Sequence, residues 1–384
     1  NQAGAQSNWL DHSRQRFKRA VAEIITAMQD RFARSDTLLD LSFSPLLVPL
    51  WQTALSFKGN TARSLHDVAR LHIQRQGVAR DQPIFSFINL METHTPYHPP
   101  MSCVERFAPH MLRDQAAQRY LRRFNSDVFG WLAPLSSMLS EKEQRTLDGM
   151  YCAEVAHEDE LVGAFLEKLR ASGRLDETLL IVTADHGEHL GEKQFVGHGL
   201  SLYNELIHVP LIVRDPGGDF PRGATTTPVV STRRLFHTIL TAARVASSEE
   251  QSLTLAQSSA GDPDNGVVFA EGIPALNTLH LLERRAPHLI RARGCDLVRR
   301  AVFSGHHKLI KTGENKLELY DLLDDSSEEI NIRDVLPEQV EVMEEQLEAF
   351  VNQTEPAQPE TDQAPGYDDP QVRRRLRDLG YLEE

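Results

Sequence analysis

The sequence is poor in cysteine and has neither a long apolar run nor an excess of positive charge. Three cysteines occur in 384 residues, Cys103, Cys152 and Cys295, and no two of them stand in a Cys-x-x-Cys spacing. An odd number without that spacing gives no sign of a disulfide framework or of a cysteine-based zinc site. No apolar run approaches the roughly 20 residues that span a bilayer, so no transmembrane segment is predicted.

The charge balance excludes one class of partner. The formal net charge is -14, which argues against nucleic acid or an anionic membrane as the partner of the whole surface. Hydrophobic residues make up 40% and charged residues 25% of the chain, as in an ordinary globular protein. The first residue is Asn1 rather than Met, so the lack of an export signal leaves localisation open.

Strand and helix patterns alternate through the first two thirds of the chain. Apolar spacings of three and four predict helices at residues 10–33, 61–76, 151–171, 230–245 and 337–352. Short apolar runs predict strands at residues 84–90, 178–183 and 209–213. This alternation predicts an α/β core with a mostly parallel central sheet flanked by helices.

A second pattern begins near residue 267. Short strands without intervening helices are predicted at residues 267–271, 301–303, 307–311 and 317–322, which favours a small antiparallel subdomain. We therefore divide the chain into a core (1–266), a C-terminal subdomain (267–352), and a linker with a terminal helix (353–384).

The strongest chemical signal follows the strand at residues 178–183. Asp185 and His186 stand at its carboxyl end, where ligands bind in open α/β sheets. The chain turns there with the help of Gly187, so both side chains can reach one ion. A helix-capping Asp beside an ordinary loop His is the competing interpretation.

Two further histidines follow predicted strands. His94 lies in a proline-rich loop after the strand at 84–90, where an imidazole can act as an acid or donate to an anionic oxygen. His198 stands between two glycines, which let the backbone approach a ligand closely. Each is weak alone, but we expect all of them at one edge of the same sheet.

Several segments resemble the sulfatase family of the alkaline-phosphatase-like superfamily. They are residues 87–100 (FINLMETHTPYHPP), 151–163, 183–192 (TADHGEHLGE), 202–213, 308–310 with 319–322, 328–331, and 376–382. The resemblance covers about residues 80–384 and implies an alkaline-phosphatase-like sandwich with a small C-terminal antiparallel subdomain. It implies an arylsulfatase-like sulfuric ester hydrolase acting on a small-molecule or glycan sulfate ester.

The resemblance also implies roles for the four residues. Asp185 and His186 would be ligands of one divalent metal ion, calcium first, with manganese or zinc also admitted by the imidazole. His94 would contact the sulfate or its leaving group. His198 stands where many members carry a sulfate-binding Lys, and it can replace that Lys only when protonated or as a neutral donor.

One family motif is absent from the sequence. No cysteine or serine begins a Cys/Ser-x-Pro-x-Arg segment, the motif in which that residue becomes formylglycine. We expect that the chain lacks the N-terminal part of the fold that carries the nucleophile and an Asp pair for the metal. Residues 1–384 alone are then expected neither to hydrolyse sulfate esters nor to bind the metal tightly.

Two other functions stay open. A phosphodiesterase, phosphonate monoester hydrolase or phosphoethanolamine transferase would share the sheet and the Asp-His pair. A non-catalytic remnant would retain them without activity. The segments at 103–148 and 270–300 are expected to shape the substrate site, and the second contains four arginines, Arg284, Arg285, Arg291 and Arg293. Members of the family are often exported, but neither localisation nor oligomeric state can be read from this sequence.

Overall fold

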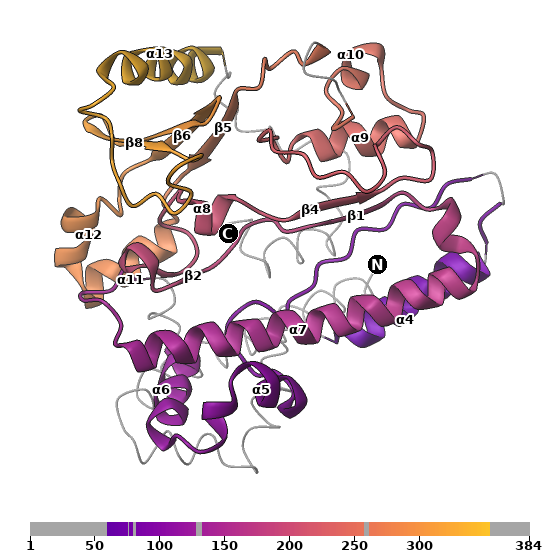
Figure 1. Ribbon diagram of the computed structural model, residues 1–384, viewed down its shortest axis with the longest axis horizontal. Helices are drawn as coiled ribbons and strands as arrows, with labels where there is room; N and C mark the ends of the chain where they lie inside the picture. The colour runs from indigo at the N-terminus through magenta and orange to yellow at the C-terminus, as the bar shows by residue number, and fades with distance from the viewer. Residues whose placement is uncertain (1–59, 76, 80–81, 128–132, 257–260, 354–384) are drawn as a thin grey trace, which may run out of the picture.

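A layer of strands lies between two layers of helices (Figure 1). The computed structural model describes residues 60–75, 77–79, 82–127, 133–256 and 261–353. The helices predicted at residues 10–33 and at the C-terminal end therefore lie outside the described residues, as does the predicted linker beyond Gln353. Among the described residues, no helix is both long enough and apolar enough to cross a lipid bilayer.

The longest helix, α7 (Glu141–Ala171), carries most of the first helical layer. It confirms the helix predicted at 151–171 and begins ten residues earlier, at a capping box formed by Ser140 and Glu143. The predicted helix at 61–76 is α4 (Thr61–Gln74), which packs against α7 through Leu65, Ala69, Phe165 and Leu169.

Three short helices lie on the other side of α7, away from the strands (Figure 1). They are α5 (Met101–Phe107), the 3-10 helix η1 (Pro109–Leu112) and α6 (Gln115–Ser126). Tyr97, Leu121, Phe124, Leu147 and Met150 form the buried cluster that joins them to α7. Helices therefore make up much of the segment between residues 103 and 148.

The central strands differ from the prediction in direction. β1 (Leu180–Thr183) and β4 (Leu211–Arg214) confirm two predicted strands, but they pair antiparallel, with Thr183 opposite Leu211. A parallel central sheet is not seen in the part of the chain that the structure describes. An apolar run fixes an extended backbone, whereas strand direction depends on which partner the chain brings beside it.

The strand predicted at residues 84–90 is extended but is not part of a ladder within the described ranges. Its side chains still alternate, since Phe85 and Phe87 are 67% and 83% exposed while Ile84, Ser86, Ile88 and Leu90 are half-buried. Among the described residues the prediction of a strand was therefore wrong, because alternation of buried and exposed side chains favours an extended backbone, whereas a ladder also needs a neighbouring strand.

A hairpin and a short helix connect β1 to β4. The hairpin is β2 (His189–Leu190) paired with β3 (Val196–Gly197) around the 3-10 helix η4 (Glu192–Gln194), and it is followed by α8 (Asn204–Ile207). Beyond β4, the helix predicted at 230–245 is α9 (Arg234–Ala242), and a short helix, α10 (Ser248–Gln251), follows it.

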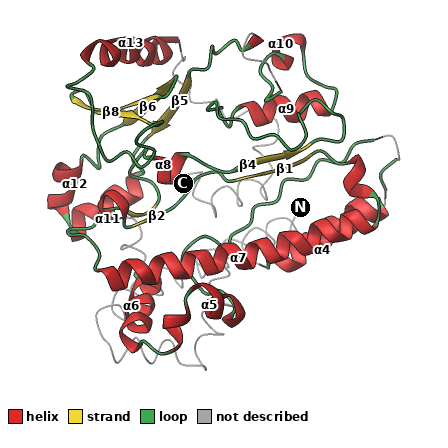
Figure 2. Ribbon diagram, viewed as in Figure 1, coloured by secondary structure: helices red, strands yellow, loops and turns green. Residues whose placement is uncertain are grey.

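The C-terminal part forms one antiparallel sheet, as predicted (Figure 2). Its strands run in sequence order: β5 (Val268–Gly272), β6 (Arg299–Ser304), β7 (His307–Thr312) and β8 (Lys316–Asp321). The prediction that no helices intervene was wrong, because two helices, α11 (Leu276–Arg285) and α12 (Pro287–Arg293), separate β5 from β6. The predicted helix at 337–352 is α13 (Pro337–Gln353), whose Met343 and Leu347 pack on the sheet.

Candidate active site

Three histidine rings from three separate segments meet in one cluster. The ring of His198, after β3, lies 4.2 Å from that of His186, after β1, and 5.0 Å from that of His94 (centroid distances). Asp185 adjoins His186, and its Oδ1 lies 3.8 Å from His186 Nε2. The structure therefore brings together all four residues that the sequence singled out.

Carboxylates of α7 hold the loop that carries His94. Glu154 Oε1 accepts a hydrogen bond from the His98 N–H (2.5 Å), and Glu158 accepts from the backbone and side chain of Thr93. Two residues earlier than His94, Glu92 accepts from the hydroxyl of Thr61 on α4 (2.8 Å). The loop is thus held by hydrogen bonds on both sides of His94.

The environment of His94 favours its neutral form. Burial lowers the pKa of the imidazole, and the neighbouring His198 and His186 lower it further, against the opposing effects of the Thr95 carbonyl and Glu188. Nδ1 lies 2.5 Å from the Thr95 carbonyl oxygen, which only accepts hydrogen bonds, so Nδ1 carries the hydrogen. The Nε2 lone pair of the neutral ring is then available to a substrate proton.

His198 has the opposite electrostatic character. Its Nδ1 donates to Glu188 Oε1 at 3.1 Å, and the Glu188 side chain is only 5% exposed. Burial alone lowers the pKa of His198, but the hydrogen bond and charge of Glu188, with the charge of Asp185, outweigh burial and raise it. A His–carboxylate pair of this kind favours an imidazolium whose Nε2–H is free to donate to an anion.

The side chains of Asp185 and His186 lie beside each other and offer one oxygen and one nitrogen donor. His186 Nδ1 donates to the Gly187 carbonyl (2.8 Å), which leaves the Nε2 lone pair on the side of Asp185 Oδ1. Metal-bound histidines usually give their other N–H to such an acceptor. Ligand atoms with metal bonds of about 2.0–2.4 Å lie roughly 3 Å apart, so the present 3.8 Å needs only a small shift. The donor set therefore fits a divalent ion, as two members of a larger coordination shell.

The turn that carries this pair is held against α8. The Gly187 N–H donates to the Leu206 carbonyl (2.7 Å), and a Cβ at Gly187 would lie 2.0 Å from the carbonyl oxygen of Glu205. Gly187 is required here for close approach between two backbones.

The remaining histidines of this region have other positions. His189 is 1% exposed, and its Nε2 contacts the Ser201 hydroxyl at 2.7 Å, so it stabilises the hairpin from inside. His208, at the end of α8, is exposed. Of the four arginines expected near the substrate, Arg291 is exposed and Arg293 contacts the Lys193 carbonyl (3.5 Å), while the side chains of Arg284 and Arg285 are not described.

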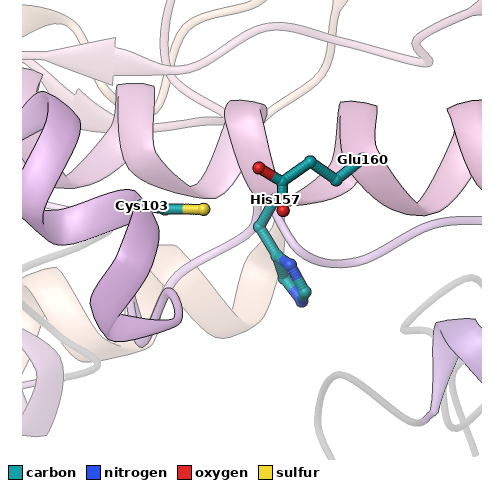
Figure 3. A group of neighbouring side chains, drawn as sticks. All are labelled: Cys103, His157 and Glu160. Carbon is teal, nitrogen blue, oxygen red and sulfur yellow. The ribbon is translucent and has the colours of Figure 1, made fainter.

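Groups of three potential metal ligands occur elsewhere in the described residues. One consists of Cys103, His157 and Glu160 (Figure 3), and the other of His306, His307 and Asp321. Neither was predicted from the sequence, because their members are separated along the chain. The sequence analysis also did not name Glu188 as a site residue. Glu188 belongs to the Asp-His-Gly-Glu segment and follows the candidate ligand His186 by two residues, and this position could have identified it.

A family model and several curated proteins match this chain. The family model described as Sulfatase matches residues 16–245. The chain is 26% identical over 163 residues to the uncharacterized sulfatase YidJ of Escherichia coli K12, covering 40% of this chain and 31% of that protein. It is 27% identical over 151 residues to the multifunctional alkaline phosphatase superfamily protein PehA of Trinickia caryophylli, covering 35% and 29%.

The fold also matches a solved structure. The phosphonate monoester hydrolase of Agrobacterium radiobacter superposes with a TM-score of 0.53 at 18% identity, over 75% of this chain and 60% of that one. This likeness concerns the fold alone. The alignments with the two curated relatives span about a third of each relative's length.

Proposed function

Because the chain belongs to the sulfatase family of the alkaline-phosphatase-like superfamily, we propose that His94, Asp185, His186 and His198 form the anion-binding and metal-binding part of a sulfuric ester hydrolase site. The observation that carries the proposal is the contact of His198 with Glu188. It supports a cationic imidazole at the position where the family commonly uses a lysine. A sulfate ester is an anion, and a charged donor in a half-buried site is suited to hold one of its oxygens.

The four side chains take different roles in this proposal. His198 donates its Nε2–H to a sulfate oxygen while Glu188 balances its charge. His94, which is neutral in the free site, takes up a proton at Nε2 from solvent and gives it to the oxygen that joins the sulfate to the rest of the substrate as that S–O bond breaks. Asp185 and His186 hold a divalent cation, calcium in the first instance, which when bound acts as a Lewis acid on the sulfate.

The proposal extends to the whole fold. We assign residues 1–266 to the catalytic core and residues 267–352 to the C-terminal subdomain. The small antiparallel sheet supports the second assignment.

A binding experiment tests the proposal without requiring turnover. Inorganic sulfate is titrated into chelator-treated residues 1–384 at pH 6, and the imidazole C–H signals are followed by NMR. We expect saturable shifts of the His198 signal and of the neighbouring His94 signal, and the shift of the His94 signal is expected to be lost in His198→Gln and weakened in Glu188→Gln. His208→Gln removes an exposed histidine of the same region and is the matched control. A response to sulfate that persists in His198→Gln contradicts the proposed site.

A second candidate function is phosphoryl or phosphonyl ester hydrolysis. It is favoured by the similarity to PehA and by the fold shared with a phosphonate monoester hydrolase. Assays of residues 1–384 with an aryl sulfate and a phenylphosphonate monoester separate the two. Since no Cys/Ser-x-Pro-x-Arg motif is present, we expect no turnover of the aryl sulfate by this chain alone, whereas turnover of the phosphonate monoester favours the second candidate.

A further inference from the structure

A cysteine, a histidine and a glutamate meet on the side of α7 that faces away from the strands. Cys103 belongs to α5, and His157 and Glu160 belong to α7. One potential ligand atom from each, a sulfur, a ring nitrogen and a carboxylate oxygen, lies within 4.8 Å of the other two (Figure 3). Cys103 is fully buried, His157 is half-buried and Glu160 is exposed, so the cluster opens from the interior to solvent through the carboxylate.

The packing of α5 on α7 explains why these residues meet. His157 and Glu160 are three residues apart on one helix and therefore project from the same face. Gly149 lets the two helices approach closely, because a Cβ there would lie 3.0 Å from both the Ala108 Cβ and the Phe107 carbonyl oxygen. The three ligand atoms are thus placed by rigid helices rather than by loops.

The spacing of the cluster suits a small metal ion. Zinc bonds of about 2.3 Å to sulfur and about 2.0–2.2 Å to nitrogen and oxygen put tetrahedral ligand atoms roughly 3.4–3.7 Å apart. A contraction of at most about 1.4 Å, within the reach of side-chain rotation, closes the present cluster around an ion. Thiolate and imidazole together select a zinc-type cation over calcium or magnesium.

The guanidinium of Arg106 competes with a metal ion for the carboxylate of Glu160. Arg106 Nη1 lies 3.1 Å from Glu160 Oε1, and both side chains are more than half exposed. An exposed ion pair of this kind contributes little to stability, and the guanidinium can also rest over the Phe107 ring, 5.1 Å away. The pair therefore does not prevent Glu160 from binding a metal.

We propose that Cys103, His157 and Glu160 bind a zinc-type divalent ion that fastens α5 to α7, with water as the fourth ligand. Binding replaces the proton of the Cys103 thiol, which is released to solvent, and removes water from the hydrated ion. The site is separate from Asp185 and His186, which lie after β1. The bound ion would affect the candidate active site through the loop that carries His94. This loop ends where α5 begins, so an ion that holds α5 against α7 also holds one end of the loop.

The second cluster, His306, His307 and Asp321, is the natural comparison. His306 and His307 stand side by side with ring centroids 4.2 Å apart, and His306 Nε2 lies 3.6 Å from Asp321 Oδ2. It lies on the surface of one hairpin and contains no sulfur. An ion held there, or by Asp185 and His186, lacks the thiolate signature that a Cys103 site has.

Cobalt is the probe that separates these sites. Chemically reduced, chelator-treated residues 1–384 are titrated with Co²⁺, and the near-ultraviolet thiolate-to-Co²⁺ charge-transfer band is recorded. We expect a saturable band in the wild type that Zn²⁺ abolishes by displacement, and an increase in Tm on Zn²⁺ binding. Cys103→Ser removes the band, and Glu160→Gln and His157→Gln weaken binding by at least roughly tenfold.

Two control variants keep the outcome interpretable. Cys152→Ser removes the exposed thiol of the same helix, and the double substitution of His306 and His307 by Gln removes the second cluster. Both are expected to retain the band. If Cys103→Ser fails to fold, Glu160→Gln decides, because an exposed side chain can be changed without disturbing the core. A wild type without the band, or a band lost only in Cys152→Ser, overturns the proposal, and neither result bears on sulfate binding at His198.

Discussion

The carboxylate of Glu188 lies 3.1 Å from Nδ1 of His198. This contact distinguishes His198 from His94, whose ring lies 5.0 Å away. Glu188 opposes the effect of burial and raises the pKa of His198, whereas burial prevails at His94 and lowers its pKa. Glu188 therefore strengthens proton binding at His198, whereas burial weakens proton binding at the neighbouring His94.

Replacing Glu188 by Gln is expected to lower the pKa of His198, because the opposing charge is lost while burial remains. NMR titration of the imidazole C–H signals in chelator-treated protein measures this value. Glu192→Gln changes the carboxylate beside His189 in the same hairpin and is expected to leave His198 unaffected. If His198 has the same pKa in the wild type and in Glu188→Gln, this account is wrong.

The same pair makes a prediction for stability. Because the folded pKa of His198 is raised above its ordinary value of 6.5, the Glu188–His198 interaction contributes fully below pH 6.5 and is lost as pH rises through the folded pKa. The stability difference between the wild type and Glu188→Gln, measured by urea unfolding, should therefore shrink between about pH 6 and pH 8.

Gly187→Ala should destabilise the protein by about 1–3 kcal/mol through overpacking, since its Cβ would lie 2.0 Å from the Glu205 carbonyl oxygen. The clash is also expected to move Asp185 and His186 away from α8. Gly163→Ala is the control, because Gly163 lies in α7 with no heavy atom within 4 Å of the added Cβ. That substitution should stabilise by about 0.5–1 kcal/mol, so equal effects in urea unfolding would contradict the close-approach argument.

The sequence predicted the site better than the sheet. Asp185 and His186 were placed by a short apolar run that ends in a turn, and such a signal depends only on neighbouring residues. The antiparallel pairing of β1 and β4 and the missing ladder at residues 84–90 depend on which strands become neighbours. That choice is set by the path of the whole chain, which local apolar patterning does not encode.

The carboxylates that contact the site residues and their loops could not be predicted from the sequence either. His94, His186 and His198 were named one by one, but nothing in their spacing tells which carboxylate faces which ring. Glu154 and Glu158 anchor the loop of His94 from about 60 residues away, and such contacts exist only after α7 packs against that loop. These contacts are therefore tertiary in origin.

The start of α7 offers a local test. The Ser140 hydroxyl accepts from the Glu143 N–H (3.4 Å), and the Glu143 carboxylate accepts from the Ser140 N–H (2.9 Å). Ser140→Ala should cost about 1 kcal/mol of unfolding free energy, the usual value of an N-cap. Ser137→Ala, at an exposed position three residues earlier, should change it by less than about 0.5 kcal/mol. Similar values for both variants would exclude a capping role.

Lys308 and Glu328 join the C-terminal sheet to the core. Both side chains are fully buried with 2.6 Å between Lys308 Nζ and Glu328 Oε1, and Asn204 of α8 bonds to both. Lys308→Met leaves the Glu328 carboxylate buried without its cation and should cost about 3–5 kcal/mol. The double variant Lys308→Met with Glu328→Gln removes both charges and should recover a large part of that loss in urea unfolding.

The pH dependence of Lys308→Met separates charge from packing. Burial already raises the pKa of Glu328 above its ordinary 4.5, and loss of the lysine raises it further. A carboxyl with a raised folded pKa stabilises the fold while it is protonated, and this contribution is lost as pH rises from about 4.5 through the folded value. The destabilisation of Lys308→Met should therefore grow between about pH 5 and pH 8, while that of the double variant stays constant over the same range. A loss in the single variant that does not change with pH would assign the cost to packing rather than to the buried charge.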